Sequence, residues 1–497
     1  MQQMRTRPAT LAHQKLSDLA ELIQAETVAG PHTKVSGLTL ASKSVHAGDL
    51  FVAAAGQAAH GIQFLDAAID AGARAVLTDP VGAQQVPEGF PMLVVPDPRA
   101  VVAMVAAAIY DSPSEAFVTI GITGTQGKTT TTHIAQAAFG PSRSAVVGTI
   151  GTRIAGHPVH SALTTPEAPE LQALFAVMRE EQVEACFMEV SSHALVQGRV
   201  NGFIFDVAVF LNLGRDHLDF HADIDDYFAA KALLFTPEHA RRAVINIDDE
   251  FGRRLAAQTT IPFETFSVEG NDANWRVTSI HESGRGSEVS VDLPSGEALT
   301  FVLPIPGRFN VSNALATIVA LSAAGYRPED LVAGLADLQG VPGRMEQIDT
   351  GRGFSVVVDY AHKPDAIRAI LTALRPVTTG ELVIVMGAGG DRDRGKRPLM
   401  GEISAELADV VIVTDDNPRS EDPAQIRAEI VAGISGEARV HQIEGRRAAI
   451  EFALAAATQG DTIVVAGKGH ESGQEINGVV HPFDDRHVAR ELLEELP

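Results

Sequence analysis

FVTIGITGTQGKTTTT, residues Phe117 to Thr132, is the stretch that decides the fold of this chain. An apolar run stops there at a turn rich in glycine and threonine, which ends in Lys-Thr-Thr. This order predicts a strand, a phosphate-binding loop and the start of a helix. A polyphosphate is bound by several backbone N–H groups that point into one concavity, and only small residues let the backbone come that close. Gly124 and Gly127 provide the space.

The loop is a variant of the common pattern GxxxxGK[ST], because its first glycine comes one position early, at Gly121. Lys128 is expected to reach the terminal phosphates as a point charge, while Thr129 or Thr130 offers a hydroxyl to Mg²⁺. The alternative is an ordinary strand-to-helix turn that contains a lysine. We favour the phosphate loop because an apolar run precedes it and a helical pattern follows it.

Composition narrows the class of protein. The 497 residues carry 39 Lys and Arg against 63 Asp and Glu, a formal charge of −24, which disfavours nucleic acid and anionic membranes as partners. Cys186 is the only cysteine and lies in an apolar run, so we expect a buried structural thiol and a reducing compartment. Because the N-terminus shows no signal-peptide core and no apolar stretch is long enough to span a bilayer, we expect a cytoplasmic protein.

Periodicity predicts an α/β chain of three domains. Short apolar runs alternate with helical stretches over residues 1–112, which predicts a small α/β domain. Over 113–340, apolar strands end repeatedly in polar residues, so we expect a doubly wound, mostly parallel sheet with its ligand site at the carboxyl ends of the strands. Alternation at 275–302 predicts an antiparallel insertion in this domain. Residues 341–497 are expected to form an open, Rossmann-like α/β domain.

Candidate polar residues follow the strands of the middle region. Glu189 and His217 come at neighbouring strand ends beside the phosphate loop, which suits a site that holds Mg²⁺ against phosphate oxygens. Ser192 and His193 do not indicate a hydrolase, because adjacent residues on a strand point apart and no nucleophile elbow surrounds the serine. For His193 and His221, a structural or solvent-facing role remains open.

Two further positions stay ambiguous from the residues alone. Lys231 lies on an otherwise apolar helical stretch, where its ammonium either pairs with phosphate or extends to solvent. The Thr164-Thr165 loop suits a phosphate or carboxylate contact, and equally an N-cap and turn.

Three strand ends of the last region carry charged, glycine-rich loops. GAGGDRDRGKRP contains Arg392, DDNPR contains Arg419 and GKGHE contains Glu471. Arginine binds a carboxylate in bidentate fashion, while a carboxylate side chain takes an ammonium. A zwitterionic amino acid needs both, so we predict an amino-acid site at this rim. The alternative is that each charge is an ordinary solvated loop residue.

Ten motifs together resemble those of the Mur ligase superfamily: TGTQGKTT, EVSSH, NLGRDHLDFH, YFAAKALLF, GRFNVSNAL, PGRME, DYAHKPD, GGDRDRGKRP, DDNPR and AGKGHE. The members are ATP-dependent enzymes of peptidoglycan precursor synthesis, and hence of cell-wall biogenesis, cell shape and cell division. The resemblance spans nearly the whole chain. It implies an N-terminal domain for the UDP end of the substrate, a central domain for ATP and a C-terminal domain for the incoming amino acid, in a chain expected to be a monomer.

The resemblance implies roles for the residues that match these motifs. The UDP-N-acetylmuramoyl-dipeptide is expected to contact Leu40, Ser42, Gln57, Ala58, Ala59, Thr164, Thr165, Ser191, Gln197 and Arg199. ATP is expected to contact Gly124, Thr125, Gln126, Gly127, Lys128, Thr129, Thr130, Asn310, Arg344 and Asp359. The amino acid is expected to contact Arg392, Asp416, Asn417, Pro418, Arg419, Gly467 and Glu471. Magnesium ions are expected at Thr129, Glu189, His217 and Lys231, the last as a carbamate, and Lys128, Lys231 and His217 are the expected catalytic residues.

The family pattern also implies an amino acid and a reaction. The DNPR tetrad, Asp416–Arg419, accompanies use of meso-diaminopimelate, and lysine-adding relatives lack its arginine. Diaminopimelate differs from lysine by a distal carboxylate that Arg419 and Arg392 can bind, whereas lysine leaves a buried arginine unpaired. The implied reaction is phosphoryl transfer from ATP to a free carboxylate of the D-glutamate residue, followed by attack of the diaminopimelate amine. No protein nucleophile is needed, because positioning and charge neutralisation by Lys128 and Mg²⁺ provide the catalysis.

Other functional assignments fit the sequence motifs less well. A lysine-adding ligase or one that adds D-alanyl-D-alanine is disfavoured by DNPR and GKGHE, and a folylpolyglutamate synthase by the N-terminal AGDLFVA segment. A nucleotide-binding protein without turnover fits poorly, because ATP and an amino acid each have a predicted site. The chain departs from the usual family pattern at Gln126 and Leu163, where relatives often have asparagine.

Overall fold

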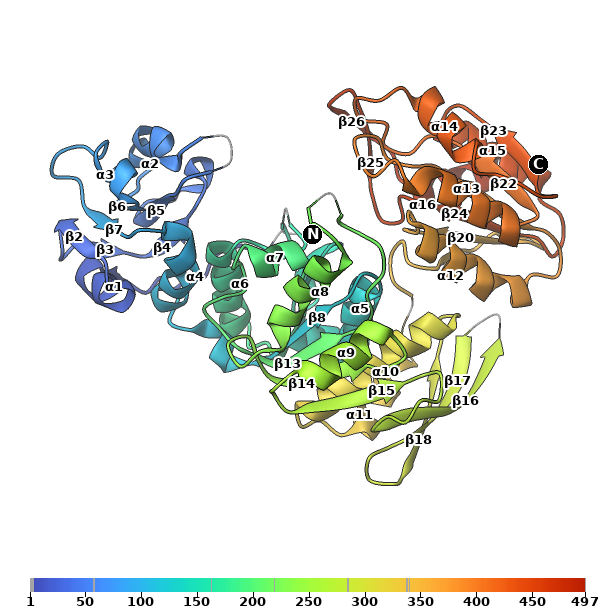
Figure 1. Cartoon of the computed structure of the whole chain (residues 1–497), viewed down its shortest axis with the longest axis horizontal. Helices are drawn as coiled ribbons and strands as arrows, with labels where there is room; N and C mark the ends of the chain where they lie inside the picture. The colour runs from blue at the N-terminus through green and yellow to red at the C-terminus, as the bar shows by residue number, and fades with distance from the viewer. Residues whose placement is uncertain are drawn as a thin grey trace.

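The computed structural model describes residues 4–496, apart from 57–58, 162, 219, 284–285, 337 and 339. Figure 1 shows an N-terminal, a central and a C-terminal body along the chain. The described residues build one large sheet in each body, with five, eleven and six strands. The three-domain α/β architecture expected from the sequence is therefore confirmed. None of the helices in these ranges has the length and apolar character needed to cross a bilayer.

The N-terminal sheet has the strand order β2-β7-β6-β5-β4 and is parallel except for β2. Side chains alternate along β5, so Val52 joins the core beneath α1 and α4, while Phe51 and Ala53 face α2. The strands are β1 Gln14–Lys15, β2 Glu26–Ala29, β3 Lys34–Val35, β4 Gly37–Thr39, β5 Asp49–Ala53, β6 Ala75–Thr78 and β7 Met92–Val94, and the helices are α1 Leu16–Ile23, α2 Leu65–Asp70, α3 Pro80–Ala83 and α4 Pro98–Ile109.

An N-terminal strap, residues 4–10, joins the first domain to the second. Arg7 donates to both carboxylate oxygens of the buried Asp49 in β5, at 2.7 and 2.9 Å. The backbone N–H groups of Ala9 and Thr10 donate to Glu180 at the end of α6 (Ala168–Glu180), each at 2.9 Å. Helix α6 also contributes alanines to the core of the first domain. The two domains are therefore joined through α6.

The central sheet has the order β11-β10-β9-β12-β8-β13-β14-β15-β16-β17-β18 and is parallel from β9 to β16. The predicted antiparallel insertion is β16–β18, whereas the antiparallel β10 and β11 were not foreseen. The strands are β8 Val118–Thr123, β9 Ser144–Gly148, β10 Gly151–Ile154, β11 His157–Val159, β12 Ala185–Glu189, β13 Phe205–Phe210, β14 Ala240–Asn246, β15 Phe263–Ser267, β16 Trp275–Ser283, β17 Gly286–Asp292 and β18 Ala298–Leu303.

Helices cover both faces of the central sheet, as a doubly wound fold requires. Apolar residues of α5, α10 and α11 pack on one face, and those of α6, α7, α8 and α9 on the other. Cys186 lies in the core beneath α6, α7, α8 and α9. Burial raises the pKa of its thiol to about 12, in line with the expected structural role. The helices are α5 Lys128–Phe139, α6 Ala168–Glu180, α7 Ser192–Val196, α8 Ile224–Ala232, α9 Glu250–Gln258, α10 Arg308–Ala323 and α11 Pro328–Leu335.

The C-terminal sheet has the order β19-β20-β24-β21-β22-β23, and only β19 runs antiparallel to its neighbour. Helices α12, α13 and α14 cover one face, and α15 and α16 the other. The strands are β19 Glu346–Ile348, β20 Ser355–Asp359, β21 Leu382–Met386, β22 Val410–Val413, β23 Arg439–Gln442 and β24 Thr462–Ala466, with a hairpin of β25 Gly473–Ile476 and β26 Val479–Pro482. The helices are α12 Pro364–Leu374, α13 Lys396–Leu407, α14 Pro423–Val431, α15 Arg446–Ala456 and α16 Asp485–Glu495.

A fully buried ion pair fastens the two helices of the second face. Arg446 of α15 donates to both oxygens of Asp485 in α16, each at 2.7 Å, and to the carbonyl oxygen of Ala466 at the end of β24, at 2.8 Å. The pair thus joins α15, α16 and the strand that precedes the GKGHE loop.

Replacement of Asp485 by alanine is expected to destabilise the C-terminal domain by about 3–5 kcal/mol, because a buried guanidinium loses its counter-charge. Hydrogen exchange of the β21 and β24 amides measures this loss without unfolding the whole chain. The double variant Arg446→Met, Asp485→Ala should regain much of the protection. Wild-type exchange in Asp485→Ala would show that the pair contributes nothing to stability.

Candidate functional site

A cavity of about 880 Å³ lies between the carboxyl edge of the central sheet and the C-terminal domain. Its walls come from sequence motifs that are more than 200 residues apart, such as those of Thr125 and Arg344. Parallel strands bring the loops that follow them to one edge of the sheet, and this explains the convergence. Predicted site residues in the lining are Thr125, Gln126, Gly127, Lys128, Thr129, Thr130, Thr164, Thr165, Glu189, Ser191, Arg199, His217, Asn310, Arg344, Asp359 and Arg392.

The phosphate loop lies between β8 and α5. Gly127 caps α5 with φ +86°, a conformation that side chains rarely adopt, and a Cβ there would lie 2.4 Å from Oδ1 of Asn313. Asn212 holds the loop in place. The backbone N–H of Thr125 donates to the carbonyl oxygen of Asn212 at 3.0 Å, and the backbone N–H of Gln126 donates to its side-chain oxygen at 2.9 Å. The loop backbone and the N-terminus of α5 are therefore preshaped for an anion.

Two lysine side chains converge on one carbonyl oxygen of this loop. Nζ of Lys128 lies 2.8 Å from the oxygen of Gly124, and Nζ of Lys231 lies 3.0 Å from it. Lys231 is only 1% exposed, so the alternative in which it extends to solvent is wrong. Burial lowers the pKa of Lys128 to about 8. Burial, and then the charge of Lys128, lower the pKa of Lys231 well below its ordinary value, which favours a neutral amine.

Glu189 and His217 both line the cavity but have different partners. The buried carboxylate of Glu189 accepts hydrogen bonds from the backbone N–H and the hydroxyl of Thr149, at 2.8 and 3.0 Å. His217 lies 3.0 Å from Asp216, which also pairs with Lys363 of the C-terminal domain. The described part of the chain holds no cluster of three His, Cys, Asp or Glu side chains close enough to bind a metal ion. A magnesium site on phosphate does not need one, because Mg²⁺ keeps waters and phosphate oxygens as ligands.

Ser192, His221 and Asp226 are connected like the triad of a hydrolase, but Ser192 and His221 are too buried to meet a substrate. Nε2 of His221 lies 2.9 Å from Oγ of Ser192, and Nδ1 lies 3.0 Å from Asp226. Ser192 is 1% exposed and begins helix α7, not a strand as assumed from the sequence. A hydrolase is excluded because Ser192 and His221 are both buried. Their contacts with each other and with Asp226 instead join α7 to α8. His193 instead stacks on Phe220, with 4.0 Å between ring centroids.

The predicted contacts for the UDP-linked substrate fall into two groups. Around the cavity, Arg199 donates to the carbonyl oxygen of Thr165 at 3.1 Å and to Gln197 at 2.6 Å. The Thr165 hydroxyl donates to the carbonyl oxygen of Glu189 at 2.8 Å, so it does not cap a helix. Of the predicted residues in the N-terminal domain, Leu40, Ser42 and Ala59 do not line this cavity, and Gln57 and Ala58 lie outside the described residues.

The predicted amino-acid residues gather at the rim of the C-terminal sheet. Nδ2 of Asn417 donates to Glu471 at 3.0 Å, and Nζ of Lys468 donates to Oδ1 of Asn417 and to the same Glu471 oxygen, at 3.0 and 3.1 Å. Lys468 is fully buried and was missed from the sequence, although a lysine between two glycines directly after an apolar strand was a usable signal. Gly467 has φ +121°, and a Cβ there would lie 2.6 Å from the carboxylate of Asp416.

Arg392 and Arg419 both come close to Gly389. A Cβ on Gly389 would lie 3.0 Å from a guanidinium nitrogen of Arg419 and 3.9 Å from Cγ of Arg392. Arg392 lines the cavity, whereas Arg419 does not; it contacts Glu475 of β25 and the carbonyl oxygen of Gly390, at 3.2 and 2.6 Å. The structure thus brings the two arginines to one place, as the sequence predicted.

Comparison with known proteins points to one family. The models described as "Mur ligase family, catalytic domain", "Mur ligase middle domain" and "Mur ligase, glutamate ligase domain" match residues 34–110, 122–321 and 343–469. A UDP-N-acetylmuramoyl-L-alanyl-D-glutamate--2,6-diaminopimelate ligase from Streptomyces avermitilis is 49% identical over 98% of each chain. A UDP-N-acetylmuramyl-tripeptide synthetase from Leifsonia xyli is 44% identical over 93% of this chain and 92% of its own. A solved structure of a UDP-N-acetylmuramoyl-L-alanyl-D-glutamate--2,6-diaminopimelate ligase is 34% identical, with TM-score 0.69 over 97% of this chain and 99% of the other.

Replacement of Lys128 by methionine is expected to weaken ATP binding about tenfold or more, because a charge-assisted contact with phosphate is lost while the side chain keeps its length. Equilibrium titration with ATP measures the effect, and the exposed Lys34→Met serves as a control that makes the same change in net charge. Equal affinity in the two variants would exclude a role for Lys128 in phosphate binding.

Proposed function

The chain belongs to the Mur ligase family, and from that premise we propose that it joins meso-diaminopimelate to UDP-N-acetylmuramoyl-L-alanyl-D-glutamate at the expense of ATP. Relatives named for this reaction are 45–49% identical over nearly the whole chain. The observation that carries the proposal is that one cavity exposes the phosphate loop, the Thr164-Thr165 loop and Arg392 of the amino-acid rim together. A ligase needs a phosphoryl donor, a carboxylate and an amine within reach of each other.

The proposed first step is phosphoryl transfer. The N-terminus of α5 and Lys128 hold the terminal phosphates of ATP, and Arg199 and the Thr164-Thr165 loop hold the dipeptide end of the UDP-linked substrate. A free carboxylate oxygen of the D-glutamate residue attacks the terminal phosphorus, so a C–O–P bond forms and the bond to ADP breaks. Lys128 stabilises the charge that passes through the phosphoryl group.

The proposed second step is aminolysis of the acyl phosphate. The diaminopimelate amine attacks the acyl carbon, the C–N bond forms, and inorganic phosphate leaves with its electron pair while the amine loses a proton. Water has to be kept from the acyl phosphate in the meantime. We propose that the C-terminal domain closes over the cavity for this purpose, and the Lys363–Asp216 ion pair already joins that domain to the central one.

Magnesium fits this site. The hydroxyl of Thr129 and the carboxylate of Glu189 both line the cavity and are oxygen donors of the kind that Mg²⁺ prefers. When bound, the ion would neutralise negative charge on the phosphates. We propose these two residues, with His217 nearby, as its protein contacts.

We also propose that Lys231 carries a carbamate. The proposal rests on its burial, its lowered pKa and its place beside Lys128. A neutral amine can attack CO₂, forming an N–C bond with release of one proton, and the product places a negative charge next to Lys128. Labelled bicarbonate should therefore yield a carbamate carbon signal in the wild type that is absent from Lys231→Met. A wild-type spectrum without that signal would contradict this assignment and leave the ligase proposal unaffected.

The amino acid is proposed to be selected at the rim of the C-terminal sheet. Glu471 and Asn417 offer oxygen atoms to an ammonium group, and Arg392 and Arg419 offer guanidinium groups to the distal carboxylate. A lysine-adding ligase is the runner-up, because the Leifsonia xyli relative's name does not specify the amino acid.

We further propose that the protein acts as a cytoplasmic monomer in peptidoglycan precursor synthesis, and thus in cell shape and division. Its single buried thiol suits a reducing compartment.

Phosphate release from ATP with the UDP-linked dipeptide and a panel of amines tests the function. Release is expected to require both substrates and to be faster with meso-diaminopimelate than with L-lysine or D-alanyl-D-alanine. Arg419→Ala is expected to lower kcat/KM for diaminopimelate about a hundredfold and that for lysine much less, because only diaminopimelate has the distal carboxylate. Preference for lysine would overturn the specificity, and intact ATP would favour a non-catalytic nucleotide-binding protein.

A further inference from the structure

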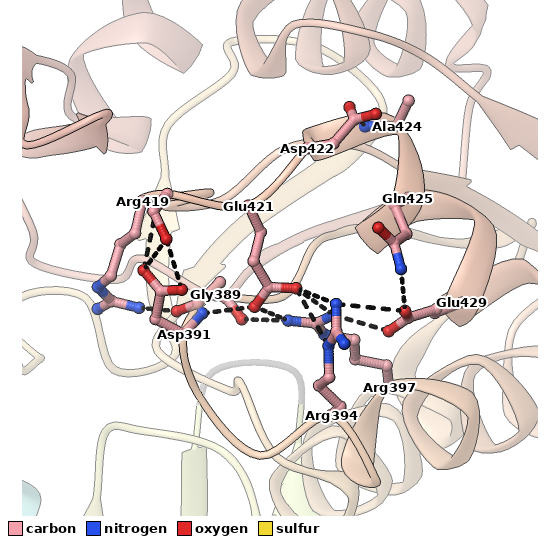
Figure 2. Close-up of polar contacts among 12 residues, drawn as sticks. Gly389, Asp391, Arg394, Arg397, Arg419, Glu421, Asp422, Ala424, Gln425 and Glu429 are labelled. Atoms are coloured by element: carbon pink, nitrogen blue, oxygen red, sulfur yellow. Dashed lines mark hydrogen bonds and ion pairs between the residues drawn. The ribbon is translucent and has the colours of Figure 1, made fainter.

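Arg397, in the first turn of α13, has a side chain that is fully buried although it carries a charge. One guanidinium nitrogen lies 3.0 Å from Oε2 of Glu421 and the other 2.9 Å from Oε1, which is a bidentate pair. The first nitrogen also donates to Glu429 of α14 at 2.7 Å, and the second to the carbonyl oxygen of Gly389 at 3.2 Å. Figure 2 shows this arrangement, with Arg394 also bonded to Glu421. We call Arg397 and Glu421 the clamp.

The clamp joins two loops that the proposed function uses. The glycine-rich loop, residues 387–395, follows β21 and carries Arg392, whereas the DNPR loop, residues 415–421, follows β22 and carries Arg419. Glu421 also accepts a hydrogen bond from the backbone N–H of Asp391, at 2.6 Å. In return, the Asp391 carboxylate accepts from the N–H and the hydroxyl of Ser420. The loops are therefore tied together in both directions (Figure 2).

The two loops are also in direct backbone contact. A Cβ on Gly390 would lie 1.9 Å from the carbonyl oxygen of Pro418, so no larger residue fits there without moving a loop. Arg392 of one loop and Arg419 of the other both come close to Gly389, as described above. A change in the spacing of the loops therefore changes the position of one arginine relative to the other.

The Glu421 carboxylate of the clamp has a lowered pKa. The hydrogen bonds from Arg397 are the largest cause that lowers the pKa of Glu421, to about 2. The stability that this lowered pKa contributes is present above the ordinary glutamate pKa and is lost only as the pH falls toward 2. A buried ion pair is weak as a source of stability, because the loss of hydration offsets most of the attraction, but it holds its partners in one geometry.

We propose that the clamp sets the separation of Arg392 and Arg419, and thereby the preference for an amine that carries a distal carboxylate. This inference rests on the proposed function and names residues that act on its amino-acid site without touching the substrate. Arg397 is a positioning residue, since the hydrogen bonds of its buried side chain go to the two loops and to α14.

The first test compares Arg397→Met with the wild type in phosphate release. KM for diaminopimelate is expected to rise about tenfold, since small displacements of positioning groups are costly, while KM for ATP and for the UDP-linked dipeptide stays within about twofold. The preference for diaminopimelate over lysine is expected to fall by the same factor. Arg375→Met is the control in the same domain, because Arg375 bonds Asp409 and two carbonyl oxygens at the opposite edge of the sheet. An equal loss for both amines in Arg397→Met would overturn the proposal.

A double-mutant cycle separates positioning from general stability. In an Arg419→Ala background, Arg397→Met is expected to have little further effect on KM for diaminopimelate, since the group that it positions is gone. A full additional tenfold effect would show that Arg397 acts elsewhere, and would overturn the proposal.

Gly389→Ala tests the same idea with the clamp intact, and it serves if Arg397→Met fails to fold. Its φ lies outside the left-handed range, so alanine is tolerated by the backbone, but the added Cβ would push on Arg419. We expect an unchanged melting temperature and a lower preference for diaminopimelate over lysine, and an unchanged preference would contradict the inference. A wild-type enzyme that shows no diaminopimelate-dependent phosphate release would instead contradict the proposed function itself.

Discussion

Two buried lysine side chains approach one carbonyl oxygen at the carboxyl edge of the central sheet, and the rest of the site is organised around this contact. Lys128 and Lys231 both lie within 3.0 Å of the Gly124 oxygen, in a chain whose formal charge is −24. Buried like charges are unfavourable unless an anion joins them or one is neutralised. The phosphate loop provides a place for an anion. Burial and the charge of Lys128 lower the pKa of Lys231, which favours its neutral form.

The domain arrangement follows from the need to bring three reactants to that point. The N-terminal strap and α6 join the first two domains through many contacts, whereas the third domain meets the central one around the cavity. The cavity therefore lies where the central and C-terminal domains meet. In the C-terminal domain, buried pairs such as Arg446–Asp485 and Arg397–Glu421 hold the elements next to its charged loops.

Much of this was predictable from the sequence, because local context defines it. The apolar run before Gly124 and the helix after Lys128 mark the phosphate loop, and polar residues at strand ends mark the edge where the cavity lies. What could not be predicted are pairs between distant loops. Nothing near Arg397 in the sequence indicates that Glu421 and Glu429 take its charge, and nothing near Asp216 indicates Lys363. The short antiparallel strands β10, β11, β25 and β26 were missed, because few residues carry each pattern.

The most direct test of the account is the fate of the substrate carboxylate oxygen. With a heavy-oxygen label in the D-glutamate carboxylates of the UDP-linked dipeptide, an acyl phosphate intermediate leaves one labelled oxygen in the released inorganic phosphate. We expect that label in phosphate, at one atom for each amide bond formed. Amide formation with unlabelled phosphate would contradict transfer from the loop-bound nucleotide to the carboxylate.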